Sequence, residues 1–302
     1  MSNGPLVSIG VPAFNAAASV AATLEGLVSQ SHQDLEILVS DNASTDDTAR
    51  ISEEIARGDR RVRTIRQPRN LGAQGNFRFL LSAARGAFFM WAGSDDVHQP
   101  HFVEMNLELL QTDPSLSGSV SQVRWRHGGI PGSLAAGTIP LLGTPRANLA
   151  TLMRAARDNS RFYGLFRKEA LLSSFPERDF HGYDIAVMAG TLRFGGHGRV
   201  EEVLLERERR DPAEYVHGLQ STSVTFPERL FPLGHFTRTV LTQNRGMLSP
   251  SALWWLTWRN VYEHSRYWAT TDGIYGRVSR RAHGLLEPIR LKLWARHDSE
   301  PS

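Results

Sequence analysis

The stretch from Val7 to Thr48 reads VSIGVPAFNAAASVAATLEGLVSQSHQDLEILVSDNASTDDT. It contains a short apolar run, a polar turn, a segment of helical periodicity, a second apolar run and an acidic turn. The two apolar runs end at residues 12–15 and 41–44, and a later run ends at residues 94–96 (SDD). Ligands of open α/β sheets bind beyond the carboxyl ends of the strands. We therefore expect these strand ends to form one site that carries carboxylates.

Composition is typical of a soluble globular chain. The 302 residues are 41% hydrophobic and 22% charged, with a net charge of +3. The chain has no cysteine, which excludes disulfides and thiolate chemistry. No signal peptide and no apolar stretch of about 18 residues is recognisable. We expect a cytoplasmic protein, either free or peripheral on the inner face of the membrane.

Periodicity predicts the first half of the fold. Apolar residues recur at helical spacing in residues 19–30, 51–55 and 76–84, and Thr45 is the expected N-cap of the second helix. The order is strand, helix, strand, helix, helix, strand. This alternation predicts an α/β fold with a mixed, mainly parallel sheet flanked by helices. We expect one domain over residues 1–215 and a C-terminal helical region over residues 216–302.

The second half is predicted in less detail. Residues 127–145 hold five glycines and three prolines and are expected to form a long mobile loop. Residues 274–294 predict a basic amphipathic helix that is interrupted at Gly284 and Pro288. The remaining expected elements are helices that start near Pro100, Pro145 and Pro250, a helix over 185–192, and strands over 119–125 and 200–206.

The acidic turn at residues 94–96 allows two interpretations. Adjacent carboxylates at a strand end suit Mg²⁺, which prefers one or two protein carboxylates together with phosphate oxygens of the substrate. Alternatively, Asp95 and Asp96 only cap the following helix. Because Asp41 is expected at a neighbouring strand end, the ligand interpretation is favoured.

Several motifs together resemble the family 2 glycosyltransferases. They are the 7–48 stretch, RNLG (69–72), NFRFLLSAARGAFFMW (76–91) and the SDD turn; YGLFRKEAL (163–171) and HGYD (181–184) match more loosely. The resemblance is strong over about the first 110 residues. It implies an inverting, metal-dependent enzyme of the GT-A fold that uses a nucleotide-diphosphate sugar. Residues 1–110 would then bind the nucleotide-sugar, and 111–215 would bind the acceptor.

The resemblance also implies roles for individual residues. Many members carry Asp-x-Asp-Asp where this chain has Gly93 in the first acidic position, although the shorter Ser-Asp-Asp form also occurs. Asp96 would be the ligand of Mg²⁺ or Mn²⁺, Asp95 would contact the ribose, and Asp41 would bind the base, as in users of uridine nucleotides. Pro12, Ala13, Phe14 and Asn15 would line the nucleotide, and Asn70 and Gly72 would close over base and ribose.

Inverting transfer needs a base that takes the proton of the acceptor hydroxyl. By the resemblance, Asp184 occupies the position of this base. The alternative is that Asp184 only caps the helix that follows, and both roles are compatible. Asp179 is the second candidate for the base and Glu177 the third.

Cations near the end of the 200–206 strand allow two interpretations. Arg207, Arg209 and Arg210 could reach the diphosphate, but a solvated strand end that alternates with glutamates is favoured. Arg167 is either a structural partner or an acceptor contact. His181 and His197 are expected to be ordinary polar loop residues, since no second ligand at zinc spacing accompanies them.

Residues 274–296 carry six cations against one acid. The helix either packs on the domain with its arginines in water or lies on an anionic membrane surface. Nucleic acid binding is not expected, because the chain offers no binding motif and no further basic surface.

The predicted function is transfer of a sugar, most simply from a UDP-sugar, to a saccharide or lipid-linked acceptor in surface glycan assembly. An oxidoreductase that binds a dinucleotide would require Gly-x-Gly-x-x-Gly after the first strand, where this chain has Pro-Ala-Phe-Asn-Ala. A catalytically inactive module that only binds nucleotide-sugar is the remaining alternative, and the presence of Asp184 argues against it.

Overall fold

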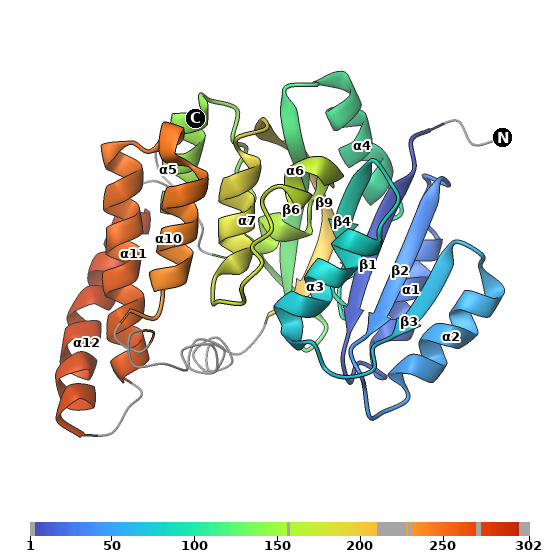
Figure 1. The fold of residues 1–302 in the computed structure, drawn as a ribbon, viewed down its shortest axis with the longest axis horizontal. Helices are drawn as coiled ribbons and strands as arrows, with labels where there is room; N and C mark the ends of the chain where they lie inside the picture. Colours follow the sequence, from blue (N-terminus) through green and yellow to red (C-terminus); the bar gives the residue numbers. More distant parts are fainter. Residues whose placement is uncertain (1–3, 156–157, 210–227, 229–230, 270–272, 296–302) are drawn as a thin grey trace.

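A computed structural model describes residues 4–155, 158–209, 228, 231–269 and 273–295 (Figure 1). A central sheet is flanked by helices, and the last helices lie at the end of the molecule opposite β2 and β3. The predicted fold class, a mixed and mainly parallel sheet with a C-terminal helical appendage, is confirmed.

The N-terminal half of the sheet is parallel. Its strands are β1 (Val7–Ala13), β2 (Leu35–Asp41), β3 (Val62–Arg66) and β4 (Phe88–Trp91), in the order β3-β2-β1-β4. Both β1 and β2 are buried almost throughout, as expected for strands that helices cover on both faces. Because the four strands run in one direction, their carboxyl ends lie at one edge.

The C-terminal half of the sheet is mixed. Strand β8 (Leu165–Arg167) pairs antiparallel with β4, and β6 (Leu116–His127) lies between β8 and β9 (Gly196–Glu208). Strands β6 and β9 are parallel, and the two-residue β5 (Val97–His98) pairs antiparallel with β9. This order brings the SDD turn, which lies between β4 and β5, next to the C-terminal end of β9.

The α-helices that cover the sheet lie near segments whose spacing or start signals predict a helix, except the one over Lys168–Leu172. The first four are α1 (Val20–Val28), α2 (Thr48–Gly58), α3 (Gly72–Ala83) and α4 (Phe102–Thr112). They are followed by α5 (Pro145–Ala155), the 3₁₀ turn η1 (Ser160–Tyr163), α6 (Lys168–Leu172) and α7 (Tyr183–Thr191). The centre of the core is aromatic, with Trp91 stacked on Phe162 at 4.2 Å between ring centroids.

The C-terminal helices are α10 (Gly234–Gln243), the 3₁₀ turn η2 (Arg245–Met247), α11 (Pro250–Ala269) and α12 (Gly273–Ala295). Helix α10 packs against α7, α11 packs against α5, and α12 pairs with α11. None of the helices in the described ranges is long and apolar enough to cross a membrane.

The structure corrects three predictions of secondary structure. Helix α2 begins at Thr48 with Asp47 as its N-cap, not after Thr45. Strand β3 was missed because this short, partly exposed edge strand reads VRTIR and lacks a strong apolar signal. Helix α12 continues through Gly284 and Pro288, because its packing against α11 outweighs the loss of one backbone hydrogen bond at proline.

The expected loop over 127–145 is also wrong in its first part. Residues 130–134 form β7 (Ile130–Leu134), which pairs antiparallel with β6. The glycines that suggested a loop form the hairpin turn, since Gly128 and Gly129 both have positive φ (54° and 82°). Such two-residue turns require this conformation, which glycine adopts without steric cost.

Candidate active site

The turns after β1 and β2 lie against each other. Ala13 is paired with Asp41 in the sheet register, and the amide of Asn42 donates to the carbonyl of Ala13 at 2.8 Å. The Asn15 amide donates to the Ser44 hydroxyl at 2.9 Å. The Asn15 side-chain oxygen accepts the amide of Thr45, also at 2.9 Å. The first two predicted strand ends therefore form one continuous surface.

The predicted nucleotide-lining residues differ in accessibility. Phe14 and Asn15 are exposed at the tip of the turn, Pro12 is half-buried, and Ala13 is buried. Asn15 has a left-handed backbone (φ 49°), which asparagine tolerates better than most residues. Phe14, about half of which is exposed, offers an aromatic face at the edge of the turn.

Asp41 is fully buried at the end of β2. One carboxylate oxygen accepts the Ser44 amide at 3.2 Å. The other, Oδ2, has no hydrogen-bond partner among the described residues and lies 3.6 Å from Nε of Arg66. A buried acceptor without a partner is costly. This oxygen is therefore suited to accept a hydrogen bond from a ligand that enters beside the turn.

Asn42, which the sequence analysis did not single out, holds the predicted base-closing loop. Its side-chain nitrogen donates to Oδ1 of Asn70 at 3.0 Å and to the Gly72 carbonyl at 3.3 Å. Its oxygen accepts the Leu71 amide at 2.8 Å. The only available signal was its position directly after Asp41. The structure thus brings Asn70 and Gly72 next to the turn that carries Asp41.

An open pocket of about 480 Å³ adjoins this loop. It is lined by Arg69, Asn70, Leu71, Gly75, Arg78, Phe79 and Ser82. The pocket includes the predicted Asn70 and two cations, but none of the predicted carboxylates. It lies on the α3 side of the loop.

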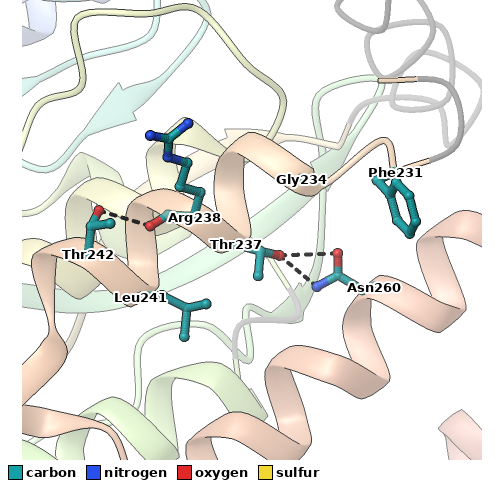
Figure 2. Close-up of a pocket in the computed structure, with 7 residues that line it drawn as sticks. All are labelled: Phe231, Gly234, Thr237, Arg238, Leu241, Thr242 and Asn260. Atoms are coloured by element: carbon teal, nitrogen blue, oxygen red, sulfur yellow. Dashed lines mark hydrogen bonds between the residues drawn. The ribbon is translucent and has the colours of Figure 1, made fainter. Parts of the chain in front are cut away.

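A second open pocket, of about 350 Å³, lies between α10 and α11 and contains no predicted site residue (Figure 2). Thr237 and Asn260 hydrogen-bond across it. Arg238 is the only charged residue in its lining. The pocket is therefore separate from the strand ends that carry the carboxylates.

Asp96 forms a buried ion pair with Arg207. Nε of Arg207 donates to Oδ1 of Asp96 at 3.1 Å, and Nη1 donates to Oδ1 of Asn159 at 3.1 Å. The guanidinium carbon lies 3.6 Å from the centroid of the Tyr163 ring, a cation–π contact. Burial, the largest single effect, would lower the pKa of Arg207, but the charge of Asp96, that of Tyr163, the hydrogen bond to Asp96 and the charge of Asp95 together raise it, so the side chain is charged.

The favoured prediction of a solvated strand end is therefore wrong for Arg207. Its side chain is only 8% exposed, because β9 runs beside β6 and turns Arg207 towards the SDD turn. Arg209 is exposed as predicted, and Arg210 lies outside the described residues.

The oxygen donors of the SDD turn suit a hard divalent cation. Asp95 is half-buried, whereas Asp96 is 1% exposed, and its second oxygen accepts the Gly93 amide at 2.8 Å. No group of three or more metal-ligating side chains occurs in the part of the chain that the structure describes. Asp95 is the more accessible of the two carboxylates.

Asp184 lies in the first turn of α7. Gly182 is the N-cap of this helix, so the alternative that Asp184 caps it is not what the structure shows. One oxygen of Asp184 accepts the amide of Ile185 at 2.8 Å. Burial lowers the pKa of nearby His181 to about 4, although the charge of Asp184 opposes the shift. His181 is therefore neutral at pH 7.

Asp179 and Glu177, the other two candidates for the base, are both exposed. Asp179 lies beside the nucleotide loop, since a Cβ built on Gly72 would be 3.8 Å from its Oδ2. Glu177 contributes its backbone carbonyl, which accepts a hydrogen bond from Arg78.

Two remaining residues prove structural. His197 is fully buried in β9, not in a loop, and contacts Thr191 Oγ1 at 2.9 Å. Arg167 donates to the carbonyls of Leu116 and Leu110 at 2.9 and 2.8 Å, so it ties β8 to the α4–β6 segment. Both positions depend on strand pairing that local sequence does not reveal.

Residues 8–175 match the family described as glycosyl transferase family 2. The chain belongs to this family. It is 31% identical to an uncharacterized glycosyltransferase of Haemophilus influenzae, over 39% of this chain and 36% of that protein. It is 36% identical to a chondroitin synthase of Escherichia coli, over 37% of this chain and 16% of that protein. The chain thus matches about a third or less of the length of these relatives.

Solved structures share the fold of this chain. The S. aureus TarS 1-349 complex with UDP-GlcNAc has a TM-score of 0.56 at 13% identity and covers 87% of this chain and 81% of that chain. A mannosyltransferase of Pyrobaculum calidifontis with GDP-Man and Mn²⁺ has a TM-score of 0.52 at 15% identity, with 98% and 88% covered. These likenesses confirm the predicted GT-A fold of the family 2 chain.

Proposed function

We propose that this family 2 chain is an inverting glycosyltransferase that moves a sugar from a nucleotide-diphosphate donor to a hydroxyl acceptor. One observation carries the proposal. The turns after β1 and β2, the loop at residues 70–72 and the SDD turn all lie at the carboxyl ends of the parallel strands. This is where an open α/β sheet binds nucleotides.

Uridine is the proposed base. Oδ2 of Asp41, which accepts no hydrogen bond within the described residues although it lies 3.6 Å from Arg66, supports this, because it can accept the ring N–H of uracil. Phe14 and Asn15 would flank the nucleotide from the β1 turn. Two similar structures hold uridine nucleotides, UDP-GlcNAc in one and UDP with Mn²⁺ in a mycobacterial glucosyl-3-phosphoglycerate synthase (TM-score 0.51).

Asp184 is the proposed base of the reaction. As the acceptor oxygen attacks the anomeric carbon, Asp184 would take its proton while the bond from that carbon to the diphosphate breaks. Asp95 would contact the ribose, and Asp96 would hold Mg²⁺ or Mn²⁺, which would neutralise charge on the departing diphosphate when bound. The buried Arg207 keeps the Asp96 carboxylate fixed for this role.

Asp184→Asn tests the proposed base, with Asp179→Asn as the matched control in the neighbouring loop. Loss of a general base costs about 10²–10⁴-fold in rate. We expect Asp184→Asn to lose kcat in this range while UDP binding by calorimetry stays unchanged, and Asp179→Asn to retain most activity. Full transfer by Asp184→Asn would refute the assignment. UDP-sugar binding without transfer by the wild-type chain would instead favour the inactive binding module.

The proposed acceptor is a saccharide or a lipid-linked saccharide. A relative that supports this is the E. coli UDP-Glc:alpha-D-GlcNAc-diphosphoundecaprenol beta-1,3-glucosyltransferase, 35% identical over 33% of this chain and 41% of that protein. A cytoplasmic enzyme with such an acceptor would work at the inner face of the membrane.

Helix α12 supports peripheral membrane contact. Leu285, Val278 and Ile289 are exposed by 72%, 62% and 46% and recur at helical spacing. The exposed cations Arg277, Arg281 and Lys292 lie beside this apolar stripe, whereas the one acid, Glu287, is paired with Arg290. Exposed cations next to apolar side chains suit an anionic lipid surface.

Flotation with lipid vesicles tests this contact. We expect wild-type protein to float with phosphatidylglycerol vesicles but not with phosphatidylcholine vesicles, and Arg277→Gln/Arg281→Gln to float less. Equal behaviour on both lipids, or no flotation, would contradict the membrane role.

A further inference from the structure

The segment that precedes Asp184 is held mainly by one buried side chain of the nucleotide-binding half, Gln74, while the exposed-side bond from Arg78 to the Glu177 carbonyl adds a fourth contact. We define residues 176–182 as the base loop. The side-chain nitrogen of Gln74, in α3, donates to the carbonyls of Pro176 at 3.3 Å and Arg178 at 2.8 Å. Its oxygen accepts the Phe180 amide at 3.1 Å. In each of the three bonds, the two residues are 102 to 106 positions apart in the chain.

Gln74 is only 4% exposed. The side-chain amide of Gln74 is buried, and its two N–H donors and its oxygen are all hydrogen-bonded to backbone groups of every second residue of the base loop (176, 178 and 180). Leaving such groups unpaired would cost about 1–3 kcal/mol each. The geometry therefore fixes the backbone of the base loop, rather than only filling space beside it.

The N-terminal end of α3, which carries Gln74, is hydrogen-bonded to the turn after β2. Asn42, in the turn after β2, bonds to Asn70, Leu71 and Gly72 at the start of α3. Gly72, two residues before Gln74, has a left-handed backbone (φ 73°). The hydrogen bonds thus run from the Asp41 turn through residues 70–72 to Gln74 and the base loop.

On its other side the base loop contacts the C-terminal helices. Arg178 donates to Glu228 at 2.8 Å, which also contacts His235 of α10 at 3.1 Å. A Cβ built on Gly182 would lie 3.4 Å from the ring of Phe236. These contacts do not involve the donor half. Among the described side chains of α3, Gln74 makes three hydrogen bonds to the base loop, whereas Arg78 makes one, to the Glu177 carbonyl.

We infer that Gln74 is a positioning residue that couples the nucleotide loop to the base loop and so sets the placement of Asp184. The inference rests on the proposed role of Asp184 as the base. It predicts that loss of the Gln74 amide lowers kcat more than it weakens nucleotide binding, because the nucleotide contacts themselves remain.

The chain offers a matched control in Gln30. This glutamine is 1% exposed and makes the same pattern of bonds. It donates to the carbonyls of Gly26 at 3.3 Å and Gln99 at 2.8 Å, and it accepts the amide of Val103 at 3.0 Å. None of these partners is a predicted site residue. A purely structural cost of losing a buried glutamine should therefore be similar at both positions.

The experiment compares Gln74→Met with Gln30→Met in the full chain. We expect both to lower the unfolding midpoint. Only Gln74→Met should lower kcat, by about tenfold or more, with the Kd for UDP within about threefold of wild type. Amide hydrogen exchange in residues 176–184 should accelerate in Gln74→Met and remain unchanged in Gln30→Met. This second readout does not depend on catalysis.

Gln74→Glu provides a rescue by pH. As a carboxylate it faces two carbonyl oxygens and should behave like Gln74→Met. Once protonated, it can donate one hydrogen bond and still accept the Phe180 amide. Its kcat relative to wild type should therefore rise as pH falls, whereas the kcat ratio for Gln74→Met should stay constant.

Unchanged exchange in residues 176–184, or a kcat of Gln74→Met within twofold of wild type, would overturn the positioning role. Failure of the proposed function is distinguishable. If Asp184→Asn kept full activity while Gln74→Met still loosened residues 176–184, the base assignment would be wrong and the coupling of the two loops would stand.

Discussion

Arg207→Met is expected to destabilise the protein strongly. In the wild type, Arg207 and Asp96 are paired at 3.1 Å with side chains only 8% and 2% exposed. Methionine fills a similar volume but leaves the Asp96 carboxylate buried with its charge uncompensated. Breaking a buried ion pair on one side costs about 3–5 kcal/mol. We expect the free energy of unfolding to fall by this amount.

Urea denaturation followed by circular dichroism measures the effect. Arg209→Met is the matched control, since Arg209 lies two residues further along and is exposed. Its cost should stay within about 0.5 kcal/mol. The double variant Asp96→Asn/Arg207→Met removes both charges. Its loss of unfolding free energy should be smaller than the sum of the losses in the two single variants, by a coupling free energy of about 2–3 kcal/mol.

A loss of less than about 1 kcal/mol in Arg207→Met would refute the reasoning, because an isolated buried carboxylate cannot be that inexpensive. Additive single effects would show that the two side chains do not interact in solution. Either result would favour the interpretation from local sequence, in which Arg207 lies in solvent at the end of the strand.

Two further predictions concern packing and pH. Gly118→Ala should cost about 1–3 kcal/mol of unfolding free energy, because its Cβ would lie 2.1 Å from the ring of Phe166. Gly58→Ala, which meets nothing within 4 Å, should be neutral or stabilising, and equal costs would contradict the packing argument. Burial lowers the pKa of His181 to about 4 and that of His197 well below its usual value, so both are neutral in the folded protein. Because the unfolded chain takes up these protons below about pH 6.5, unfolding free energy should fall between about pH 6.5 and 4. His181→Gln should reduce that slope in urea titrations at several pH values, and parallel slopes would argue against a buried neutral His181.

Local sequence predicted most of the donor half of the molecule, although it missed β3 and placed the start of α2 too early. The spacing of Val20, Leu24 and Leu27 predicts α1, and all three side chains are buried. The polar residues after β1 and β2 are indeed side by side, since Ala13 pairs with Asp41. These features depend on the 3.6-residue helical period, on short apolar runs and on turn residues, which act within a few positions of the chain.

Predictions from local sequence were wrong where strand pairing determines the secondary structure. Glycines at 128 and 129 signalled a loop but form the turn of the β6–β7 hairpin. His197 resembled a loop residue because nothing near it in sequence marks β9 as a long strand buried beside β6.

By itself, the sequence determined the family, the GT-A architecture and the strand ends at which a nucleotide-sugar is expected. Only the tertiary structure decided which side chains meet there. Arg207 reaches Asp96 across 111 positions, and Gln74 reaches Phe180 across 106. Local propensities and motifs specify short segments. The partner of a buried charge or amide is set by the order in which strands join the sheet and by how helices and loops pack on it, because only this packing brings distant residues within hydrogen-bonding distance.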